Sequence, residues 1–489
     1  MSVRVRMAPS PTGKLHLGTA YATLWPYLFA RHNKGTFILR IEDTDRERST
    51  KEFEENIIDG LKWLGFDWDE GPYHQMDRLE SYQSAIEKLL EEGKAYYCFC
   101  TKEELDEERK KQIEEKKLQV YSGRCRLLKN EEAEKKLEQK IPYVVRFKLL
   151  EGRGVIDFED VVHGKISTDS SLIGDMVIMR QSGIPLYNFA VVLDDIDMKI
   201  THIIRGDDHI SNTPKQILIY EALNHPLPAF AHYPVILNPG RVGKLSKRTG
   251  STTVEEFQKE GYLPEALLNY LLLLGWSDVL ERELFTKDQM IENFILEDLN
   301  KAPAAWDQGK LDWLNGEYIR NLSHDDLVER LEDYLVDHPS IKKLDELVPL
   351  TKDRMKKLSD FIFLTDFIFE EPEYDLGEFK LSKLPESDEE VKMILEKITD
   401  TLRDLKKPMD AKEFEKAFRK LADDLTLPAG DIFQLIRIAI SGQKVTPPLF
   451  ETIQVMGEDE AIKRVNYVAK TYPDFPNLVQ DEKVETENT

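Results

Sequence analysis

The N-terminal part of the chain alternates between two hydrophobic periods. Over residues 3–7 every second side chain is apolar, which predicts a strand with one buried face. Apolar residues then recur with helical spacing over 17–28, where Pro26 predicts a kink or an interruption. A second strand is predicted at 37–42 and a second helix at 52–64. Strands and helices in alternation are typical of a parallel sheet covered by helices.

The hydrophobic pattern changes over residues 95–185. Strand-like runs at 96–100 and 143–149 flank two highly charged helical stretches, 102–118 and 131–140. An α/β pattern returns after this segment, which predicts an α+β insertion between two halves of one sheet domain.

The remainder of the chain divides into two kinds of pattern. Buried strands are predicted at 186–193 and 200–204, followed by a helix over 214–223. Beyond residue 320 nearly every segment has the spacing of an amphipathic helix, including 325–335 and 411–421. We therefore expect the C-terminal third to be all helical.

Composition narrows the class of protein. A chain of 489 residues is long enough for about three domains. Its net charge of −24 argues against coating DNA or an anionic membrane by bulk charge, and three cysteines argue against a disulfide scaffold. The most apolar run, 270–276, is too short to span a bilayer, and residues 1–7 lack the apolar stretch of a signal peptide. We expect a multi-domain protein of the cytoplasm.

The first junction between strand and helix carries a candidate phosphate site. Residues 8–13 break the strand, and His16 and Gly18 stand where the helix begins. Backbone N–H groups at a helix N-terminus favour a phosphate, Gly18 allows close approach, and His16 can donate to an oxygen that gains charge. The alternative is a surface turn with an incidental histidine.

A second candidate lies at 243–250, after a strand predicted at 231–237. Lys244, Ser246 and Lys247 belong to a run of five residues, 244–248, that holds three cations and a hydroxyl, and glycines bracket this loop. Such a loop suits a mobile clamp on a polyphosphate. Its alternative is an exposed basic loop.

Taken together, these motifs resemble those of the class I aminoacyl-tRNA synthetases. Residues 16–19 (HLGT) are similar to their HIGH motif, with Thr in the last position, and 244–248 (KLSKR) to their KMSKS loop. Residues 8–13, 40–45 and 204–214 resemble the glutamyl-tRNA synthetases specifically.

The resemblance implies an architecture in the α/β class. It implies a Rossmann-like catalytic domain with a parallel sheet and an α+β insertion, followed by an all-helical anticodon-binding domain. The expected domains are the first catalytic half at 1–94, an acceptor-stem-binding insertion at 95–185, the second catalytic half with the stem-contact region at 186–320, and the anticodon-binding region at 321–489.

The resemblance also implies a reaction and its participants. The enzyme would activate L-glutamate with ATP and Mg²⁺ to glutamyl-adenylate, and pass the glutamyl group to the terminal adenosine of tRNA(Glu). Whether tRNA(Gln) is also charged is left open, and a monomer that binds neither DNA nor membrane is expected. Because the chain is acidic, tRNA should approach a locally basic face, and its binding should depend on salt.

Site residues follow from the resemblance together with their chemistry. A planar guanidinium suits the carboxylates of glutamate, and a carboxylate suits its ammonium. Any one arginine could instead form a surface ion pair, and an aspartate before a helix could be a cap. The expected residues are His16, Lys244, Ser246 and Lys247 for catalysis; Gly18, Thr19, Asp208, His209, Leu237 and Lys247 for ATP; Arg6, Ala8, Ser10, Glu42, Tyr187 and Arg205 for glutamate; and Arg354, Arg437, Thr446, Pro447 and Leu449 for the anticodon, unless these five are only structural.

The insertion carries a candidate zinc site. Cys98, Cys100 and Cys125 resemble the ligands of structural zinc in some glutamyl-tRNA synthetases, but the position of the fourth ligand holds Leu127, which cannot bind a metal. Tyr121 is a candidate substitute. The alternative is three buried thiols without a metal.

Two other functions compete with a synthetase. One is a nucleotidyltransferase of the same superfamily that uses no tRNA, against which the helical third argues. The other is a tRNA-binding protein whose catalytic site has decayed, against which the intact motifs argue.

Overall fold

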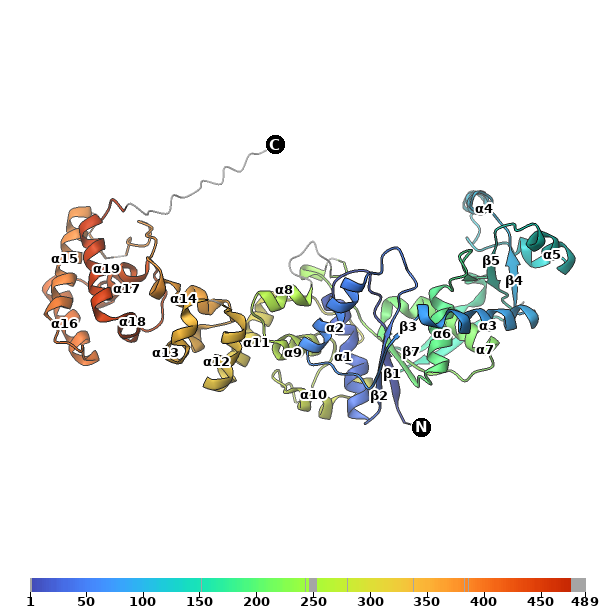
Figure 1. Ribbon diagram of the computed structural model, residues 1–489, viewed down its shortest axis with the longest axis horizontal. Coiled ribbons are helices and arrows are strands. Elements are labelled where there is room, and N and C mark those ends of the chain that lie inside the picture. Colours follow the sequence, from blue (N-terminus) through green and yellow to red (C-terminus); the bar gives the residue numbers. More distant parts are fainter. Residues whose placement is uncertain are drawn as a thin grey trace. The chain divides into compact units, whose positions relative to one another are not determined.

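The computed structural model describes residues 2–475 except 151, 242, 246–252, 279, 337, 382 and 386. The chain forms two compact units (Figure 1). The first comprises Met1–Lys259 and Pro264–Leu311, and the second Glu260–Leu263 and Asp312–Thr489. Among the described residues, no helix combines the length and hydrophobicity needed to cross a lipid bilayer.

The chain begins with a parallel sheet of order β1-β2-β3, formed by β1 (Arg4–Met7), β2 (Thr36–Ile41) and β3 (Glu70–His74). Helices α1 (Leu17–His32) and α2 (Lys51–Trp63) connect these strands. The predicted alternation of strand and helix is confirmed. The strand β3 was not predicted, because its sequence is polar and largely exposed.

A second sheet has the order β7-β6-β10-β9. It consists of β6 (Val155–Asp160), β7 (Gly164–Asp169), β9 (His202–Gly206) and β10 (Ala229–Tyr233). Strand β10 is parallel to both β6 and β9, whereas β7 is antiparallel to β6. Because β9 lies beside β1, the carboxyl ends of β1, β2, β9 and β10 are brought to one region.

A third, antiparallel sheet has the order β4-β5-β8. Its strands are β4 (Ala95–Cys98), β5 (Val144–Phe147) and β8 (Val177–Met179), and they gather with α4 (Lys102–Glu114) and α5 (Asn130–Glu138) at one end of the first unit (Figure 1). Strands β6 and β7 come from the same stretch of sequence but join the sheet of β9 and β10.

Three local predictions need correction. The strand predicted at 186–193 is the N-terminal part of helix α6 (Tyr187–Asp197), whose apolar residues are buried on almost every side. A continuous apolar run does not distinguish a buried strand from a buried helix. Helix α1 continues through Pro26, so that the interruption predicted as one of two outcomes does not occur, and the kink stays a prediction. The strand predicted at 231–237 ends at Tyr233, because Pro234 follows and has no N–H for a ladder.

The C-terminal unit is helical in its described part, as predicted. Helices α15 and α16 show how the sequence sets a helix start: the hydroxyl of Ser387 accepts from the N–H of Glu390, and the Asp410 carboxylate accepts from those of Lys412 and Glu413. Their apolar faces meet α17 and α19 in one core. The unit contains α12 (His324–Tyr334), α13 (Leu344–Thr351), α14 (Asp360–Phe369), α15 (Asp388–Asp404), α16 (Ala411–Asp424), α17 (Ala429–Ser441), α18 (Leu449–Met456) and α19 (Glu458–Thr471).

The other helices complete the first unit and its continuation into the second. They are α3 (Leu79–Glu91), α7 (Thr213–Ala222), α8 (Val254–Lys259), α9 (Pro264–Gly275), α10 (Lys287–Asn293) and α11 (Gln308–Asn321).

Truncation within the C-terminal core should destabilise the protein. Ile398 of α15 is fully buried, so that Ile398→Ala is expected to lower the free energy of unfolding by roughly 2 to 5 kcal/mol. Met393→Ala on the exposed side of the same helix should change it by less than about 0.5 kcal/mol. Urea unfolding of the full chain, followed by circular dichroism, measures both. Equal losses in the two variants would contradict this packing.

Candidate active site

The first unit contains a cavity of about 650 Å³ at the carboxyl ends of strands β1 and β9. This is the edge of a parallel sheet where ligands commonly bind, and the volume suits a small molecule. It brings together residues that were predicted from distant parts of the sequence. They are Arg6, Ala8, Ser10, His16, Gly18, Thr19, Glu42, Tyr187, Arg205, Asp208, His209 and Lys244.

The N-terminus of helix α1 forms one wall of the cavity. His16 stands before the first helical residue in an extended conformation, and its carbonyl accepts the N–H groups of Thr19 and Ala20. A Cβ atom at Gly18 would meet none of the described atoms beyond its own helix backbone and chain neighbours within 4 Å. The helix therefore offers its positive end and open space, which suits a phosphate group.

Arg205, near the end of β9, is a buried guanidinium whose described hydrogen-bond partners are neutral. Its Nε donates to Nε2 of His232 at 3.1 Å, and its Nη2 donates to the hydroxyl of Thr213 at 2.8 Å. The third nitrogen, Nη1, is buried without a hydrogen-bond partner in the described part of the chain. Burial, together with the charge of Arg6, lowers the pKa of Arg205. This cavity wall therefore favours an anionic ligand.

Glu42, which follows β2, has the opposite character. It is buried, and Arg40 donates to its Oε1 at 3.2 Å. Burial raises the pKa of Glu42, and the charges of Arg40 and Arg6 offset this only in part. The carboxylate is thus incompletely neutralised and favours a cation.

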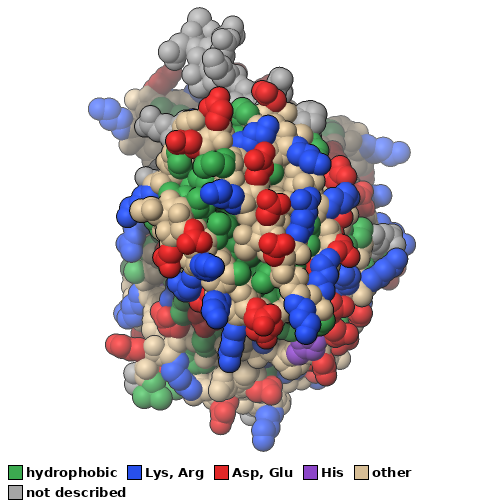
Figure 2. Space-filling view, turned by 90° about the vertical axis from the view of Figure 1, so that its left-hand side faces the viewer, with side chains coloured by type: hydrophobic (Ala, Val, Ile, Leu, Met, Phe, Trp, Pro, Cys, Tyr) green, Lys and Arg blue, Asp and Glu red, His purple; other side chains and the backbone are tan. Residues whose placement is uncertain are grey.

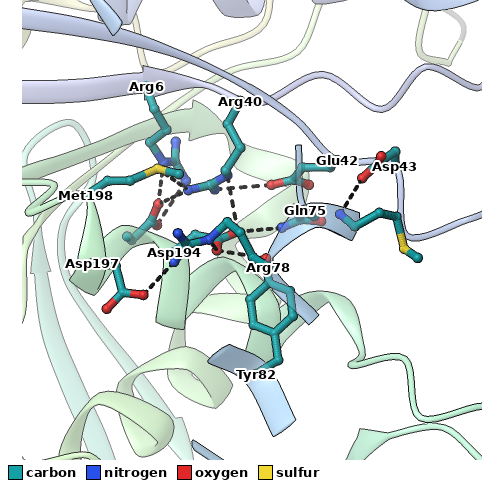
Figure 3. A network of polar contacts seen from close by, with 12 residues as sticks. Arg6, Arg40, Glu42, Asp43, Gln75, Arg78, Tyr82, Asp194, Asp197 and Met198 are labelled. Atoms are coloured by element: carbon teal, nitrogen blue, oxygen red, sulfur yellow. Dashed lines mark hydrogen bonds and ion pairs between the residues drawn. The ribbon is translucent and has the colours of Figure 1, made fainter. Parts of the chain in front are cut away.

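The reason for this incomplete neutralisation lies in a charge network behind the cavity (Figure 3). Arg6 donates to both oxygens of Asp195, at 3.0 and 3.3 Å, and Arg40 donates to Asp195 at 2.7 Å. Burial opposes ionisation of Asp195, but the charges of Arg6 and Arg40 prevail and lower its pKa. Both arginines therefore pair mainly with Asp195, and Glu42 receives only one hydrogen bond from Arg40.

A neighbouring carboxylate, Asp194, extends the network. It is fully buried and accepts from Gln75, Arg78 and the hydroxyl of Tyr82 at 2.7 to 2.8 Å. Sequence reasoning missed Arg40, Asp194 and Asp195 as part of the site. A signal was present, since two adjacent aspartates end an apolar run, and buried charges require partners.

The rim of the cavity carries the start of the second motif. Lys244 donates to Asp208 at 2.8 Å, and this contact lowers the pKa of Asp208 against the effect of its burial. Burial and the charge of Arg205 lower the pKa of His209 to about 4, so this imidazole is neutral near pH 7. Ser246 and Lys247 lie outside the described residues.

Leu237, predicted at the ATP site, is half-buried and pairs through its backbone with Lys244 rather than lining the cavity. Other lining residues were not predicted, since nothing in their residue type separates them from core. They are Met7, Pro9, Leu17, Tyr21, Ala22, Ile204, Gly206, Tyr233, Val235, Ile236 and Leu245.

The three cysteines lie together, with their sulfur atoms within 4.8 Å of one another. The hydroxyl of Tyr121 lies 3.5 Å from Sγ of Cys98 and 3.4 Å from Sγ of Cys100, and it accepts the N–H of Cys125 at 2.9 Å. Leu127 is 85% exposed. Three thiols and a phenol oxygen therefore surround one point, a donor set that could hold a metal ion.

In the second unit, the predicted anticodon residues are close in space. One nitrogen of Arg437 donates to the carbonyl of Pro447 at 2.9 Å and also to Thr446. Burial lowers the pKa of Arg437, and the nearby charge of Arg354 lowers it further. Leu449 begins helix α18. Thr446 is almost fully buried, so it contributes here through its contact with Arg437.

Comparison with protein families matches nearly the whole chain. The model of tRNA synthetases class I (E and Q), catalytic domain, matches residues 2–313, and the model of an anticodon binding domain matches residues 326–469.

Individual relatives agree over their full length. A protein named glutamate–tRNA ligase 1 of Caldanaerobacter subterraneus subsp. tengcongensis is 45% identical, across 96% of this chain and 98% of the relative. The glutamate–tRNA ligase of Carboxydothermus hydrogenoformans is 44% identical, across 95% of this chain and 99% of the relative. The crystal structure of a glutamate tRNA ligase from Elizabethkingia meningosepticum in complex with its amino acid has a TM-score of 0.84 at 33% identity, across 96% of this chain and all of that one.

The charge network gives a prediction that compares two aspartates of helix α6. Asp195→Asn removes a buried charge that pairs with Arg6 and Arg40, and is expected to lower the free energy of unfolding by roughly 3 to 5 kcal/mol. Asp197→Asn breaks a partly exposed pair with Arg78 and should cost at most about 1 kcal/mol. Urea unfolding of each full-length variant measures the difference, and a larger loss for Asp197→Asn would refute the assignment.

Proposed function

Because the chain belongs to the class I tRNA synthetases (E and Q), we propose that it is a glutamate–tRNA ligase. It is an enzyme that joins an amino acid to tRNA. The rival nucleotidyltransferase does not account for a C-terminal unit of the anticodon-binding family. A decayed tRNA-binding protein does not account for a cavity that retains both of its opposite buried charges.

One observation carries the choice of glutamate. The cavity holds a buried guanidinium, Arg205, whose described partners are neutral, and a buried carboxylate, Glu42, that is only partly neutralised. An amino acid with a carboxylate side chain supplies the anion to the first and the ammonium to the second. Glutamine would offer a neutral amide to Arg205 and leave its buried charge without a counterion.

The proposed reaction has two steps. An oxygen of the α-carboxylate of glutamate attacks the α-phosphorus of ATP, a bond to the α-phosphorus breaks, and pyrophosphate leaves. The 2′-hydroxyl of the terminal adenosine of tRNA then attacks the carbonyl carbon of the adenylate and releases its proton to the phosphate of the leaving group. The bond from this carbon to the phosphate oxygen breaks, and AMP leaves. Charge develops on oxygen in both steps, so that positioned donors and cations are sufficient and no nucleophile from the protein is needed.

Each end of the cavity has a role in this proposal. The N-terminus of α1, with Gly18 and Thr19, would receive ATP, and His16 would donate to a phosphate oxygen. Lys244 and Lys247 would neutralise the phosphates, with Ser246 holding their loop. Ala8, Ser10 and Tyr187 would complete the glutamate pocket, and Asp208 and His209 the ATP side. Leu237 would act there only through its backbone pairing with Lys244.

Mg²⁺ is proposed as a companion of ATP. Of the described lining residues, Glu42 and Asp208 alone carry a carboxylate, and Asp208 is paired with Lys244. The ion, which neutralises triphosphate charge when bound, would thus be held mainly by the phosphates themselves.

We also propose a structural zinc ion at Cys98, Cys100 and Cys125, with Tyr121 as the fourth ligand. The support is the convergence of the three sulfur atoms with the Tyr121 hydroxyl, whose 3.4 to 3.5 Å distances to two of them resemble the separations between neighbouring ligands of a tetrahedral zinc ion. Zinc there would join β4 to the segment before α5.

The tRNA partner is proposed as tRNA(Glu), with tRNA(Gln) an open second substrate, and a monomer working in the cytoplasm is the simplest arrangement. The second unit would read the anticodon, with Arg354, Arg437, Thr446, Pro447 and Leu449 as candidates. On the face seen in Figure 2, Lys and Arg are interspersed with Asp and Glu, so that contact there would rely on individual cations.

Transfer of labelled glutamate to purified tRNA tests the function. The wild-type protein should charge tRNA(Glu), and Arg205→Ala should reduce kcat/KM for glutamate by at least about 100-fold, since a buried charge-assisted contact is lost. Lys247→Ala is a second control on the ATP side. Charging of tRNA(Glu) alone would mean that the enzyme excludes tRNA(Gln), and charging of both would mean that it accepts either tRNA. Charging of neither would refute the proposal.

Metal analysis tests the zinc site. The purified wild-type protein should contain about one zinc per chain, Cys125→Ser should contain almost none, and Tyr121→Phe should bind zinc more weakly. Ser122→Ala, next to Tyr121, serves as the matched control. Full zinc retention at equal affinity in Tyr121→Phe would exclude the tyrosine as a ligand.

A further inference from the structure

Behind Arg205 lies a second pair of buried residues that does not touch the cavity. Asp160 ends strand β6, and His232 lies in β10, where Phe230 pairs with Asp160 in the ladder. Both side chains are completely buried, and Nδ1 of His232 lies 2.6 Å from Oδ2 of Asp160. Neither residue lines the cavity.

The hydrogen bonds of this pair determine which ring nitrogen carries the proton. Nε of Arg205 can only donate, and it donates to Nε2 of His232. Nε2 must therefore be an unprotonated acceptor, which leaves the proton on Nδ1, from where it is donated to Asp160. Burial and the charge of Arg205 lower the pKa of His232 despite the contact with Asp160, in agreement with a neutral ring.

The carboxylate of Asp160 is itself held in place. Its Oδ1 accepts the backbone N–H groups of Val162 and His163 at 3.0 and 2.9 Å. Only Oδ2 is left for the imidazole, so the orientation of the pair follows from the turn after β6. The turn thus orients the Asp160 carboxylate through Oδ1, and the carboxylate determines the tautomer of His232 through Oδ2.

We propose that Asp160 and His232 are positioning residues for Arg205, which fix the Nε edge of its guanidinium so that the remaining edge is kept for the substrate carboxylate. This inference rests on the proposed binding of glutamate at Arg205. Thr213 assists, since its hydroxyl accepts from Nη2 at 2.8 Å and lies 3.1 Å from Nε2 of His232. The guanidinium is then oriented by neutral groups only, and its charge is left for the ligand.

A conservative change at Asp160 tests the chain of contacts. In Asp160→Asn the amide oxygen can still accept from Val162 and His163, so its NH₂ group faces Nδ1 of His232. The ring proton must then move to Nε2, where it opposes Nε–H of Arg205. We expect KM for glutamate to rise about 10- to 100-fold and KM for ATP to change by less than about twofold.

The matched control is Asp157→Asn, on the same strand. Asp157 is exposed and contacts Ser167 and Lys165, away from the cavity. Its kinetic constants should equal those of the wild type. A KM for glutamate in Asp160→Asn that is also within about twofold of the wild type would overturn the inference.

Two substitutions of His232 separate orientation from simple packing. In His232→Gln the amide oxygen takes the place of Nε2 and can still accept from Arg205, whereas in His232→Asn the shorter amide can reach Asp160 but not Arg205. Both remove the ring. The inference predicts a clearly higher KM for glutamate in the Asn variant than in the Gln variant, and equal values would contradict it.

A measurement without activity separates this inference from the proposed function. In protein labelled with ¹⁵N-histidine, the imidazole shifts of His232 should report a proton on Nδ1 in the wild type and on Nε2 in Asp160→Asn. A wild-type proton on Nε2 would refute the positioning role even if glutamate is charged. The expected tautomers in a protein that fails to charge glutamate would refute the function instead.

Discussion

The architecture of the cavity depends on one carboxylate, that of Asp195. It accepts from Arg6 of β1 and Arg40 of β2, and thereby ties the first sheet to helix α6 across more than 150 residues of sequence. Charges in a buried environment are costly unless paired, so this contact fixes where each arginine can lie. The charge left over on the cavity side, a partly neutralised Glu42, is a direct result of that arrangement.

The selectivity of the cavity for a substrate then follows from charged side chains that no ion pair fully neutralises. Arg40 and Arg6 are occupied by acids, whereas Arg205 is surrounded by a histidine, a threonine and a tyrosine. The cavity is thus preorganised with a deficit of negative charge at one place and of positive charge at another. A ligand that supplies both missing charges gains more free energy of binding than its contact area alone would give.

Much of the fold was predictable because its elements have clear periods, such as β1, α1 and the amphipathic helices α12 and α16. The run at 186–193 was not, since a helix buried on all sides has no polar face to reveal its period. The lining residues His16, Gly18 and Thr19 could be placed from their motif, whereas Asp160 and His232 could not. Their importance lies in a contact across 72 residues, and no local pattern encodes such a pairing.

The position of strand β6 limits which segments of this chain can be exchanged without disturbing the rest. The stretch between residues 95 and 185 would look, by sequence, like an accessory that could be exchanged between related chains. Yet β6 leaves it to pair with β10, and delivers Asp160 to the histidine behind Arg205. A chimaera that replaced the whole stretch would therefore also replace Asp160, and with it the partner of the histidine that contacts Arg205.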